Sequence, residues 1–419
     1  MSDMEKYVTG LLDRARQASR TLAIASTAQK NDALMKAAAR IEAQSAKLLA
    51  ANAEDVRAAQ SAGIPAAMIE RLTLNEKRVR EMADGLRQVV ALRDPVGEVM
   101  GDWTRPNGLR IEKVRVPLGV ILMIYESRPN VTADAAALCL KSGNAVILRG
   151  GKESLRSNIA IQSVMAEALE EAGLSRDCTQ MVNTPDRAVL ELLLKAEGKI
   201  DLAIPRGGEG LIRAVMEKAR VPVIKHCKGL CHSYVDASAD LDMAEKVCLN
   251  AKLQRPAVCN AMETLLVHAK VAQDFLPRIA AKLQAAGCEM RGDERSRKIV
   301  AAMKPATEED WYTEYNALIL SVRVVDSLDE AIEHIAQYGS QHSDAIITRD
   351  EAAAREFAAR ADSSAVFINT STRFNDGAQF GFGAEIGIST DKLHARGPMA
   401  LPELTSYKYV VYGEGQVRE

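Results

Sequence analysis

The chain has 419 residues, of which 47% are hydrophobic and 26% are charged. A chain of this length exceeds one hydrophobic core, so we predict two or three domains. Its formal net charge of −2 and its aromatic content of 4% argue against nucleic-acid binding and against attachment to an anionic membrane surface. No stretch approaches the length of a membrane span, the N-terminus lacks the apolar core of a signal peptide, and the seven cysteines are scattered. We therefore expect a cytoplasmic protein with free thiols.

The N-terminal part has the pattern of amphipathic helices. Over the first ~95 residues, apolar side chains recur at helical spacing, with Leu34, Ile41 and Leu48 a heptad apart on one stripe. The sequence Asp-Pro-Val-Gly at 94–97 ends this region. Residues 98–117 then predict a β-hairpin, because Asn107-Gly108 can adopt the positive φ of a tight turn between two β-prone flanks.

From Val120 onward, short apolar strands alternate with helices. The first set of strands is VILMIY, AVILR, CTQMVN, KIDLAI and VPVIK. A second set follows Asp236, with the strands TLLVH, ALILSVRVV, AIITR and SAVFINT. Such alternation is typical of an α/β protein whose parallel sheets are doubly wound, with helices on both faces. The last strand, TSYKYVVYG, has no neighbour in sequence and must pair with a distant segment.

Two glycine-rich turns follow strands and precede helices, where a parallel sheet binds nucleotides. They are Arg-Gly-Gly-Lys-Glu-Ser at 149–154 and Pro-Arg-Gly-Gly-Glu-Gly at 205–210. Exposed amides at a helix start and neighbouring cations suit phosphate, although neither turn matches the GxGxxG fingerprint. A single glycine pair is commonly only turn chemistry. Two such turns in successive units of one sheet favour a cofactor site.

Cys259 has the sequence context of a nucleophile. It lies in the segment QRPAVCNAMETLLVH, where Pro256 disfavours helix ahead of the cysteine, so we expect irregular backbone just before a strand. A cation such as Arg255 favours a nearby thiolate, and amide groups around Asn260 can donate to an oxyanion. The alternative is a buried small hydrophobe, which is the usual role of a free cysteine.

The cluster His-Cys-Lys-Gly-Leu-Cys-His at 226–232 has metal-ligating residue types at the wrong spacing. Zinc sites draw ligand pairs from separate segments, and four ligands in so short a run cannot all reach one tetrahedral ion without strain. We therefore predict a loop beside an active site. Cys139 and Cys248 fall in apolar helices, and Cys178 and Cys288 at strand ends, so we predict packing roles for these four.

Several longer motifs extend this pattern. They are YESRPN at 125–130, SGNAVILRGGKES at 142–154, PRGGEGLIR at 205–213, HCKGLCHSYVD at 226–236, EYNA at 314–317 and NTSTRFNDGAQFGFGAEIGISTDKLHARGPM at 369–399. Together with the Cys259 segment and the order of elements, they resemble the aldehyde dehydrogenase superfamily over almost the whole chain. Within it, the chain is similar to the gamma-glutamyl phosphate reductase family.

The resemblance implies roles for individual residues. Cys259 stands at the catalytic thiol of the superfamily, with Asn260 beside it. Arg149 stands where other members carry a lysine on the adenosine ribose, Gly210 ends the turn under the pyrophosphate, and Glu314 stands at the glutamate that holds the nicotinamide ribose. The implied cofactor-binding residues are Arg149, Gly151, Lys152, Arg206, Gly207, Gly208, Gly210 and Glu314. The implied substrate-binding residues are Arg128, Asn130, Arg255 and Arg373. Each arginine could instead be a solvated surface charge.

The resemblance also implies the domains and the reaction. It places an NADP-binding domain at 1–97 and 118–235 with part of 370–397, a catalytic domain at 236–369, and a β oligomerisation arm at 98–117 and 398–419. The implied reaction is the NADPH-dependent reduction of L-glutamyl 5-phosphate to L-glutamate 5-semialdehyde through a cysteine thioester, in proline biosynthesis. The implied partners are this small-molecule substrate and further copies of the chain, with glutamate 5-kinase as a candidate. No metal, nucleic acid or membrane is implied.

One departure from the superfamily bears on the chemistry. His226 stands where the common motif ELGGKS carries a glutamate, which in hydrolytic members activates water to cleave the thioester. An acyl-phosphate reaction needs no activated water, so the departure favours that reaction. Two alternatives stay open. The first is a hydrolytic NAD(P)-dependent aldehyde dehydrogenase, which His226 disfavours. The second is a non-catalytic structural homologue, which the cysteine segment and both glycine turns disfavour.

Overall fold

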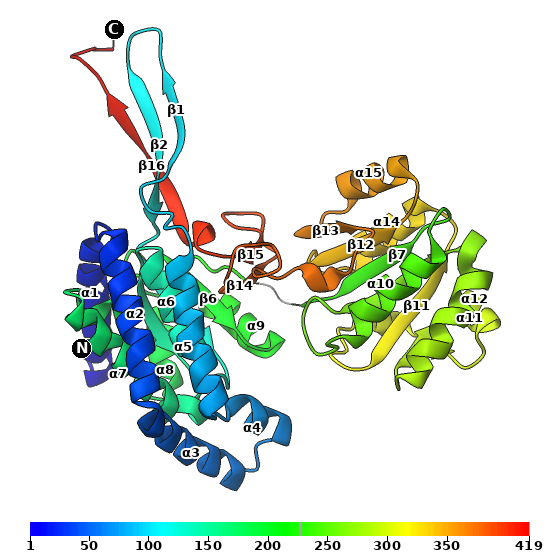
Figure 1. Cartoon of the computed structure of the whole chain (residues 1–419), viewed down its shortest axis with the longest axis horizontal. Coiled ribbons are helices and arrows are strands. Elements are labelled where there is room, and N and C mark those ends of the chain that lie inside the picture. Colours follow the sequence, from blue (N-terminus) through cyan, green and yellow to red (C-terminus); the bar gives the residue numbers. More distant parts are fainter. Residues whose placement is uncertain (226–227, 419) are drawn as a thin grey trace. The chain divides into compact units, whose positions relative to one another are not determined.

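The chain divides into two compact units (Figure 1). The structure is a computed structural model that describes residues 1–225 and 228–418. The first unit comprises residues 1–225, 381–387 and 399–419, and the second unit comprises residues 226–380 and 388–398. Two short strands, β14 (Gly387–Ser389) and β15 (Gly397–Met399), lie where the chain passes between the units.

The N-terminal helices of the first unit agree with the prediction. They are α1 (Asp3–Leu22), α2 (Thr27–Ala43), α3 (Ser45–Ser61), α4 (Ala66–Leu72) and α5 (Glu76–Ala91). Leu34, Ile41 and Leu48 are fully buried, although the helix breaks between the second and third of them. The predicted apolar stripe is therefore confirmed across two consecutive helices.

A parallel sheet forms the core of the first unit. Its strand order is β5-β4-β3-β6, and its strands are β3 (Val120–Tyr125), β4 (Ala145–Arg149), β5 (Thr179–Met181) and β6 (Leu202–Arg206). The helices between and after these strands are α6 (Asn130–Lys141), α7 (Leu155–Glu171), α8 (Arg187–Leu194) and α9 (Glu209–Lys218). Every residue of β3 is buried, as expected for a strand covered on both faces.

The predicted fifth strand of this set, VPVIK, does not form. Only one isolated bridge, between Ala203 and Val223, joins residues 221–225 to the sheet. Pro222 lacks an amide hydrogen, so this segment cannot complete a regular ladder next to β6.

An antiparallel sheet projects from the first unit (Figure 1). Its order is β1-β2-β16, with β1 (Val99–Thr104), β2 (Arg110–Pro117) and β16 (Thr405–Tyr412). The hairpin is confirmed, with Gly108 at φ 86° in its turn. The last strand of the chain pairs with β2 from Thr405–Pro117 to Tyr412–Arg110, so it finds its partner about 300 residues away.

The second unit contains a parallel sheet of the order β10-β9-β11-β8-β7-β12-β13. Its strands are β7 (Cys231–Val235), β8 (Met262–His268), β9 (Glu289–Gly292), β10 (Lys304–Pro305), β11 (Ile319–Val325), β12 (Ser343–Ile347) and β13 (Ala365–Ile368). We expected β7 at the end of the first domain. It belongs to the second unit here, because it pairs with β8 and β12.

Helices cover both faces of this sheet (Figure 1). They are α10 (Leu241–Leu253), α11 (Ala269–Ala285), α12 (Glu294–Ile299), α13 (Glu308–Trp311), α14 (Leu328–Tyr338) and α15 (Glu351–Arg360). Successive residues of β8 serve opposite cores: Leu265 and Val267 pack with α10 and α11, whereas Leu266 packs with α14 and α15. The uninterrupted apolar run of this strand therefore reflects burial on two faces.

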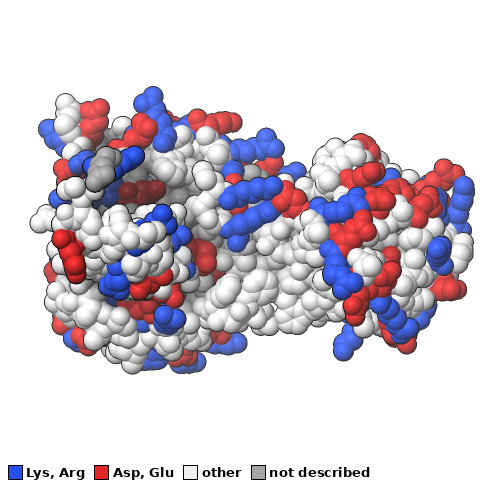
Figure 2. All heavy atoms as spheres, turned by 90° about the horizontal axis from the view of Figure 1, so that it is seen from above, with Lys and Arg blue, Asp and Glu red and all other residues white. Residues whose placement is uncertain are grey.

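The surface charges are mixed in sign. On the face drawn in Figure 2, Lys and Arg side chains are interspersed with Asp and Glu. Among the described residues, no helix combines the length and the apolar character that crossing a membrane requires.

Candidate active site

The first unit has a cavity of about 450 Å³ at the carboxyl ends of β3, β4 and β6. Its lining includes five residues of the two predicted glycine turns, namely Arg149, Gly151, Lys152, Glu153 and Gly210. The carboxyl ends of parallel strands are where α/β sheets bind nucleotides. The structure therefore brings the two turns to one cavity of a size that suits a small-molecule ligand.

Arg149 holds the first turn rather than presenting its charge freely to the cavity. Its Nη1 donates to the carbonyl of Gly150 at 2.7 Å and its Nη2 donates to the carbonyl of Pro185 at 3.0 Å. Burial lowers the pKa of this guanidinium, and the positive charge of Arg187 acts in the same direction. Lys152, by contrast, is exposed and makes no ion pair or side-chain hydrogen bond within the described part of the chain.

The second turn begins α9, with Gly208 at the N-cap. A Cβ added at Gly208 or Gly210 would meet nothing within 4 Å, so space is open beside both. Arg206, Gly207 and Gly208 are not among the residues that line the cavity, and the Arg206 guanidinium instead lies against Gly387. The structure thus brings Gly210 to the cavity and leaves Arg206 facing another segment.

The cavity contains charged residues that the sequence analysis did not single out. These are Glu126, Arg187, Glu191 and Lys218, which line it together with Glu153 of the first turn. Glu126 and Glu153 do fall in motifs that the sequence displays, but their placement on the glycine turns depends on contacts between separate segments. Arg187 starts α8 and had no sequence signal beyond its charge.

Two of the predicted substrate residues lie at the start of α6 in the first unit. Arg128 is exposed, and the side-chain amide of Asn130 donates to a carboxylate oxygen of Asp134 at 2.9 Å. Neither residue is among those that line the cavity. The other two, Arg255 and Arg373, belong to the second unit.

Cys259 lies in the second unit, in the turn between α10 and β8. Its thiol group is half-buried, whereas the other cysteines of the described residues are buried: Cys139, Cys178, Cys231, Cys248 and Cys288. Burial raises the pKa of the Cys248 thiol to about 12 and that of Cys288 to about 11, so neither forms a thiolate near neutral pH. The predicted packing roles of Cys139, Cys178, Cys248 and Cys288 are confirmed.

Asn260 fastens the Cys259 turn to the segment at 372–375. Its side-chain amide donates to the carbonyl of Asn375 at 2.9 Å, and its carbonyl accepts from the guanidinium of Arg373. Thr372 Oγ1 donates to the backbone carbonyl of Asn260 at 2.8 Å. Because the Asn260 amide is already committed to these contacts, its side chain positions the turn, and the backbone amides remain the candidates for an oxyanion.

Two arginines meet at this turn. Arg255 is exposed, and Arg373 is half-buried with its Nε donating to Gln254 Oε1 at 2.8 Å. Burial lowers the pKa of the Arg373 guanidinium, as does the nearby charge of Arg255, whereas Cys259 raises it. Arg373 therefore lies against the turn that carries Arg255 and Cys259.

The segment at 228–232 packs directly against the backbone of Cys259. A Cβ at Gly229 would lie only 2.0 Å from the carbonyl oxygen of Cys259, so only glycine permits this approach. The Sγ of Cys231 donates to the same carbonyl at 3.1 Å. His226 and Cys227 of this cluster lie outside the described residues. No group of three or more metal-ligating side chains is present in residues 1–225 and 228–418.

A buried ion pair spans the base of the Cys259 turn. Lys252, near the end of α10, and Glu263, in β8, are 2.5 Å apart and almost fully buried. Burial raises the pKa of the Glu263 carboxyl to about 7 against the opposing charge of Lys252. The other carboxylate oxygen accepts the backbone N–H of Asn316 at 3.1 Å, so the pair also anchors the segment that carries Glu314.

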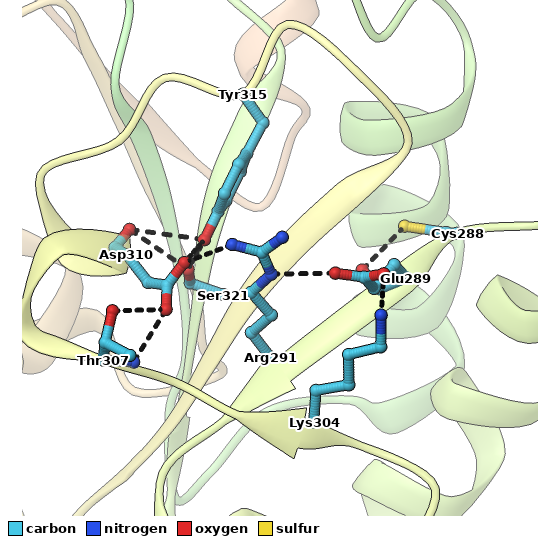
Figure 3. Close-up of polar contacts among 8 residues, drawn as sticks. All are labelled: Cys288, Glu289, Arg291, Lys304, Thr307, Asp310, Tyr315 and Ser321. Atoms are coloured by element: carbon cyan, nitrogen blue, oxygen red, sulfur yellow. Dashed lines mark hydrogen bonds and ion pairs between the residues drawn. The ribbon is translucent and has the colours of Figure 1, made fainter.

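A polar cluster holds the same segment from its other side (Figure 3). The Asp310 carboxylate accepts from the amide and hydroxyl of Thr307, from Arg291 at 2.6 Å and from the Tyr315 hydroxyl at 2.9 Å. Burial alone would raise the pKa of Asp310, but these hydrogen bonds lower it to about 2. Glu314, next to Tyr315, is therefore half-buried on a segment fixed at both ends.

Comparison with known proteins identifies the family. A model of the aldehyde dehydrogenase family matches residues 3–317. The chain belongs to the aldehyde dehydrogenase family. It is 58% identical to the gamma-glutamyl phosphate reductase of Moorella thermoacetica over 97% of both chains, and 52% identical to that of Thermodesulfovibrio yellowstonii over 100% of both. It is also similar to the crystal structure of gamma-glutamyl phosphate reductase from Thermotoga maritima, with a TM-score of 0.97 and 48% identity over 98% of this chain and 100% of that one.

The family resemblance and the fold predicted from the sequence are thereby confirmed. Members of the aldehyde dehydrogenase family are oxidoreductases that use a nicotinamide cofactor. Each of the two candidate regions, the cavity of the first unit and the Cys259 turn of the second, contains part of the residue set that the sequence analysis expected.

Proposed function

We propose that the chain reduces L-glutamyl 5-phosphate to L-glutamate 5-semialdehyde with release of phosphate, using NADPH, as the second step of proline biosynthesis from glutamate. The names of relatives that are 52–58% identical over nearly the full chain support the substrate. The observation that carries the chemistry is the half-buried Cys259 on its fixed turn, next to two arginines, while the other described cysteines are buried.

In the proposed reaction, the Cys259 thiolate attacks the acyl carbon, a carbon–sulfur bond forms, and the bond to the phosphate oxygen breaks. Reduction of the resulting thioester needs a hydride, which is the chemistry that a bound nicotinamide cofactor supplies. The oxyanion of the thiohemiacetal is stabilised by backbone amides beside Asn260. Its collapse breaks the carbon–sulfur bond, releases the aldehyde and restores the thiolate.

The substrate carries a phosphate and an α-carboxylate, and arginines bind both groups well because their guanidinium forks match the oxyanions. Arg255 and Arg373 lie at the Cys259 turn and are our candidates for these contacts. Arg128 and Asn130 in the first unit are assigned to the substrate only by their family motif.

The cavity of the first unit fits the phosphorylated end of a dinucleotide. It has two glycine turns with open space beside Gly210, and its exposed cations are Lys152, Arg187 and Lys218, of which Lys218 is paired with Glu191. We assign Arg149, Gly151, Lys152 and the turn at 206–210 to cofactor binding. Glu314 on its anchored segment is assigned to the nicotinamide ribose. The two free cations support a preference for NADPH, whose additional phosphate they would attract.

The domain roles follow from these assignments. We propose cofactor binding for the first domain, catalysis for the second and oligomerisation for the arm formed by β1, β2 and β16. The arm exposes Trp103, Tyr407, Tyr409 and Val411, which suits burial against another copy of the chain. Glutamate 5-kinase, whose product would be the substrate, is a candidate partner.

The reverse reaction tests this function. Because phosphate is the nucleophile that regenerates the acyl phosphate, oxidation of glutamate semialdehyde by NADP should require phosphate, with arsenate able to replace it. NADPH formation is followed in buffers with phosphate, with arsenate and with neither. Brisk formation with neither anion would indicate a hydrolytic aldehyde dehydrogenase, and no formation in any buffer would indicate a non-catalytic homologue.

His226 provides a second arm of this test. It lies outside the described residues, and it occupies the motif position at which hydrolytic members carry a glutamate. A carboxylate there would act as a general base on water. We therefore expect His226→Glu to raise phosphate-independent formation of free glutamate above that of the wild type, and equal rates would remove His226 from the argument.

A further inference from the structure

A carboxylate already occupies the second glycine turn. Glu126 Oε2 accepts the backbone N–H of Gly208 at 3.0 Å. A Cβ at Gly207 would lie only 2.3 Å from the same oxygen, so the carboxylate packs directly on the turn. Glu126 follows β3, and it lines the cavity of the first unit.

The first turn carries its own carboxylate, Glu153, which packs over Gly151 and binds Ser127. Glu153 Oε1 accepts the backbone N–H of Ser127 at 2.9 Å and its hydroxyl at 2.6 Å. A Cβ at Gly151 would lie 2.1 Å from this oxygen. Ser127 adopts a positive φ of 42°, which brings its amide to the Glu153 carboxylate. Two negative charges therefore border a cavity in which the bound cofactor would carry phosphates.

The Gly208 amide is a place where a phosphate would bind. It stands at the start of α9, a helix of 10 residues, whose first amides and dipole favour an anion. In the structure, the Glu126 carboxylate is the anion that accepts this N–H. A phosphate that takes this N–H would lie next to the Glu126 carboxylate, and two like charges at van der Waals distance repel each other, although solvent screens them at this exposed position.

We propose that Glu126 competes with the pyrophosphate of the cofactor for the Gly208 amide. Cofactor binding then displaces the carboxylate, and the return of the carboxylate assists cofactor release. This inference rests on the proposed function in taking the ligand of the cavity to be a dinucleotide, whose pyrophosphate extends past the cavity lining to the open space beside Gly208. It assigns to Glu126 a role in setting cofactor affinity, and it explains why a turn built for an anion contains an acidic side chain.

The test is Glu126→Gln in the full chain. Glutamine keeps a carbonyl acceptor for the Gly208 amide but removes the charge, so the ligand-free turn should stay folded. Isothermal titration calorimetry measures the Kd of NADPH and of adenosine 2′-monophosphate, which has no pyrophosphate. We expect the Kd of NADPH to fall about five- to tenfold, the size of one charge-assisted hydrogen bond, and the Kd of adenosine 2′-monophosphate to stay within about twofold.

Glu209→Gln is the matched control. Glu209 begins the same helix and carries the same charge, but its carboxylate pairs with Arg213, four residues along. Its removal should change the Kd of NADPH much less than Glu126→Gln does. A second variant, Glu126→Ala, removes both charge and acceptor and should give the same gain in affinity with a lower melting temperature.

Any of the following results would overturn the inference: an unchanged or larger Kd of NADPH in Glu126→Gln, equal gains for both ligands, or an equal gain in the Glu209→Gln control. Absence of NADPH binding by both wild type and Glu126→Gln would also overturn it. These titrations need no turnover, so a wild type that binds NADPH but fails the phosphate-dependence assay would refute the proposed reaction while leaving the Glu126 result to stand.

Discussion

At the scale of single residues, the environment of Cys259 separates it from the other cysteines. Contacts from Gly229, Cys231 and Asn260 fix its backbone, and Cys259 is half-buried whereas the other cysteines in the described part of the chain are buried. A nucleophile needs both properties, because it must reach the substrate and must be held in one orientation while it does so. The structure supplies both by backbone contacts around the turn.

Cys259→Ala tests the nucleophile. We expect the rate of glutamyl phosphate reduction to fall by a factor on the order of 10^4 or more, because the whole covalent path passes through this sulfur. The Kd of NADPH and the melting temperature should stay near those of the wild type. Steady-state kinetics and calorimetry measure these quantities. A mutant that retained a tenth of the activity would show that Cys259 is not the nucleophile.

Cofactor preference is also decided by single side chains. Lys152 is exposed with no partner in the described residues, whereas Arg149 is tied to the carbonyls of Gly150 and Pro185. We therefore expect Lys152→Ala to lower the ratio of kcat/KM for NADPH over NADH by about tenfold, the size of one charge-assisted contact. Arg149→Ala should instead weaken both cofactors alike, because the turn loses its anchor. Equal discrimination by Lys152→Ala and wild type would show that Lys152 is an ordinary surface charge.

At the scale of elements, the ion pair between Lys252 and Glu263 joins three pieces of the second unit. It connects the end of α10 with β8 across the Cys259 turn, and through Asn316 it reaches the segment that leads into β11. A buried charge without its partner is costly, since the desolvation penalty remains when the attraction is lost. The nucleophile turn and the Glu314 segment therefore depend on one pair.

Lys252→Met tests this dependence. We expect the free energy of unfolding of the second unit to drop by about 3–5 kcal/mol, the usual cost of breaking a buried pair from one side. The double variant Lys252→Met/Glu263→Leu should recover much of this loss, because no unpaired charge remains. Urea unfolding measures both, and Lys246→Met on the exposed face of the same helix is the control, expected to stay within about 0.5 kcal/mol of the wild type. A double variant as unstable as the single one would contradict this account.

At the scale of the whole molecule, the arm sheet has little core of its own. Trp103, Tyr407, Tyr409 and Val411 are all at least 40% exposed, and aromatic contacts link Trp103 with Tyr409 and Tyr409 with Tyr407. Large apolar side chains gathered on the surface of a sheet are typical of a face that binds another protein surface. Burial of this face against a second copy would stabilise it.

Tyr409→Glu with Val411→Glu tests the arm. We expect the double variant to dissociate into monomers, because two charges would enter an apolar interface. Lys408→Glu is the control, since successive residues of a strand face opposite sides and Lys408 therefore lies on the other face of β16. Light scattering coupled to size-exclusion chromatography gives the mass of each. A monomeric wild type, or an unchanged mass in the double variant, would contradict the proposed role.

The sequence by itself determined the element types, the alternation that builds the two parallel sheets, the nucleophile candidate and the family. These depend on signals that are local in the chain: apolar periodicity, turn residues such as Asn107-Gly108, and short motifs around Cys259 and the glycine turns. Where a local signal misled, as in the VPVIK segment, a single residue, Pro222, was enough to prevent a regular strand.

Only the tertiary structure decided which partner each of these segments meets. It showed that β16 completes the arm next to β2, that Glu126 and Glu153 lie on the two glycine turns, and that Lys252 and Glu263 tie two loops together. It also showed that the Asn260 side chain holds the Cys259 turn against the segment at 372–375. The physical reason is that hydrogen bonds and ion pairs act over a few ångströms in space. The sequence specifies which groups carry the charges and donors, but their distances exist only once the sheets bring remote segments side by side.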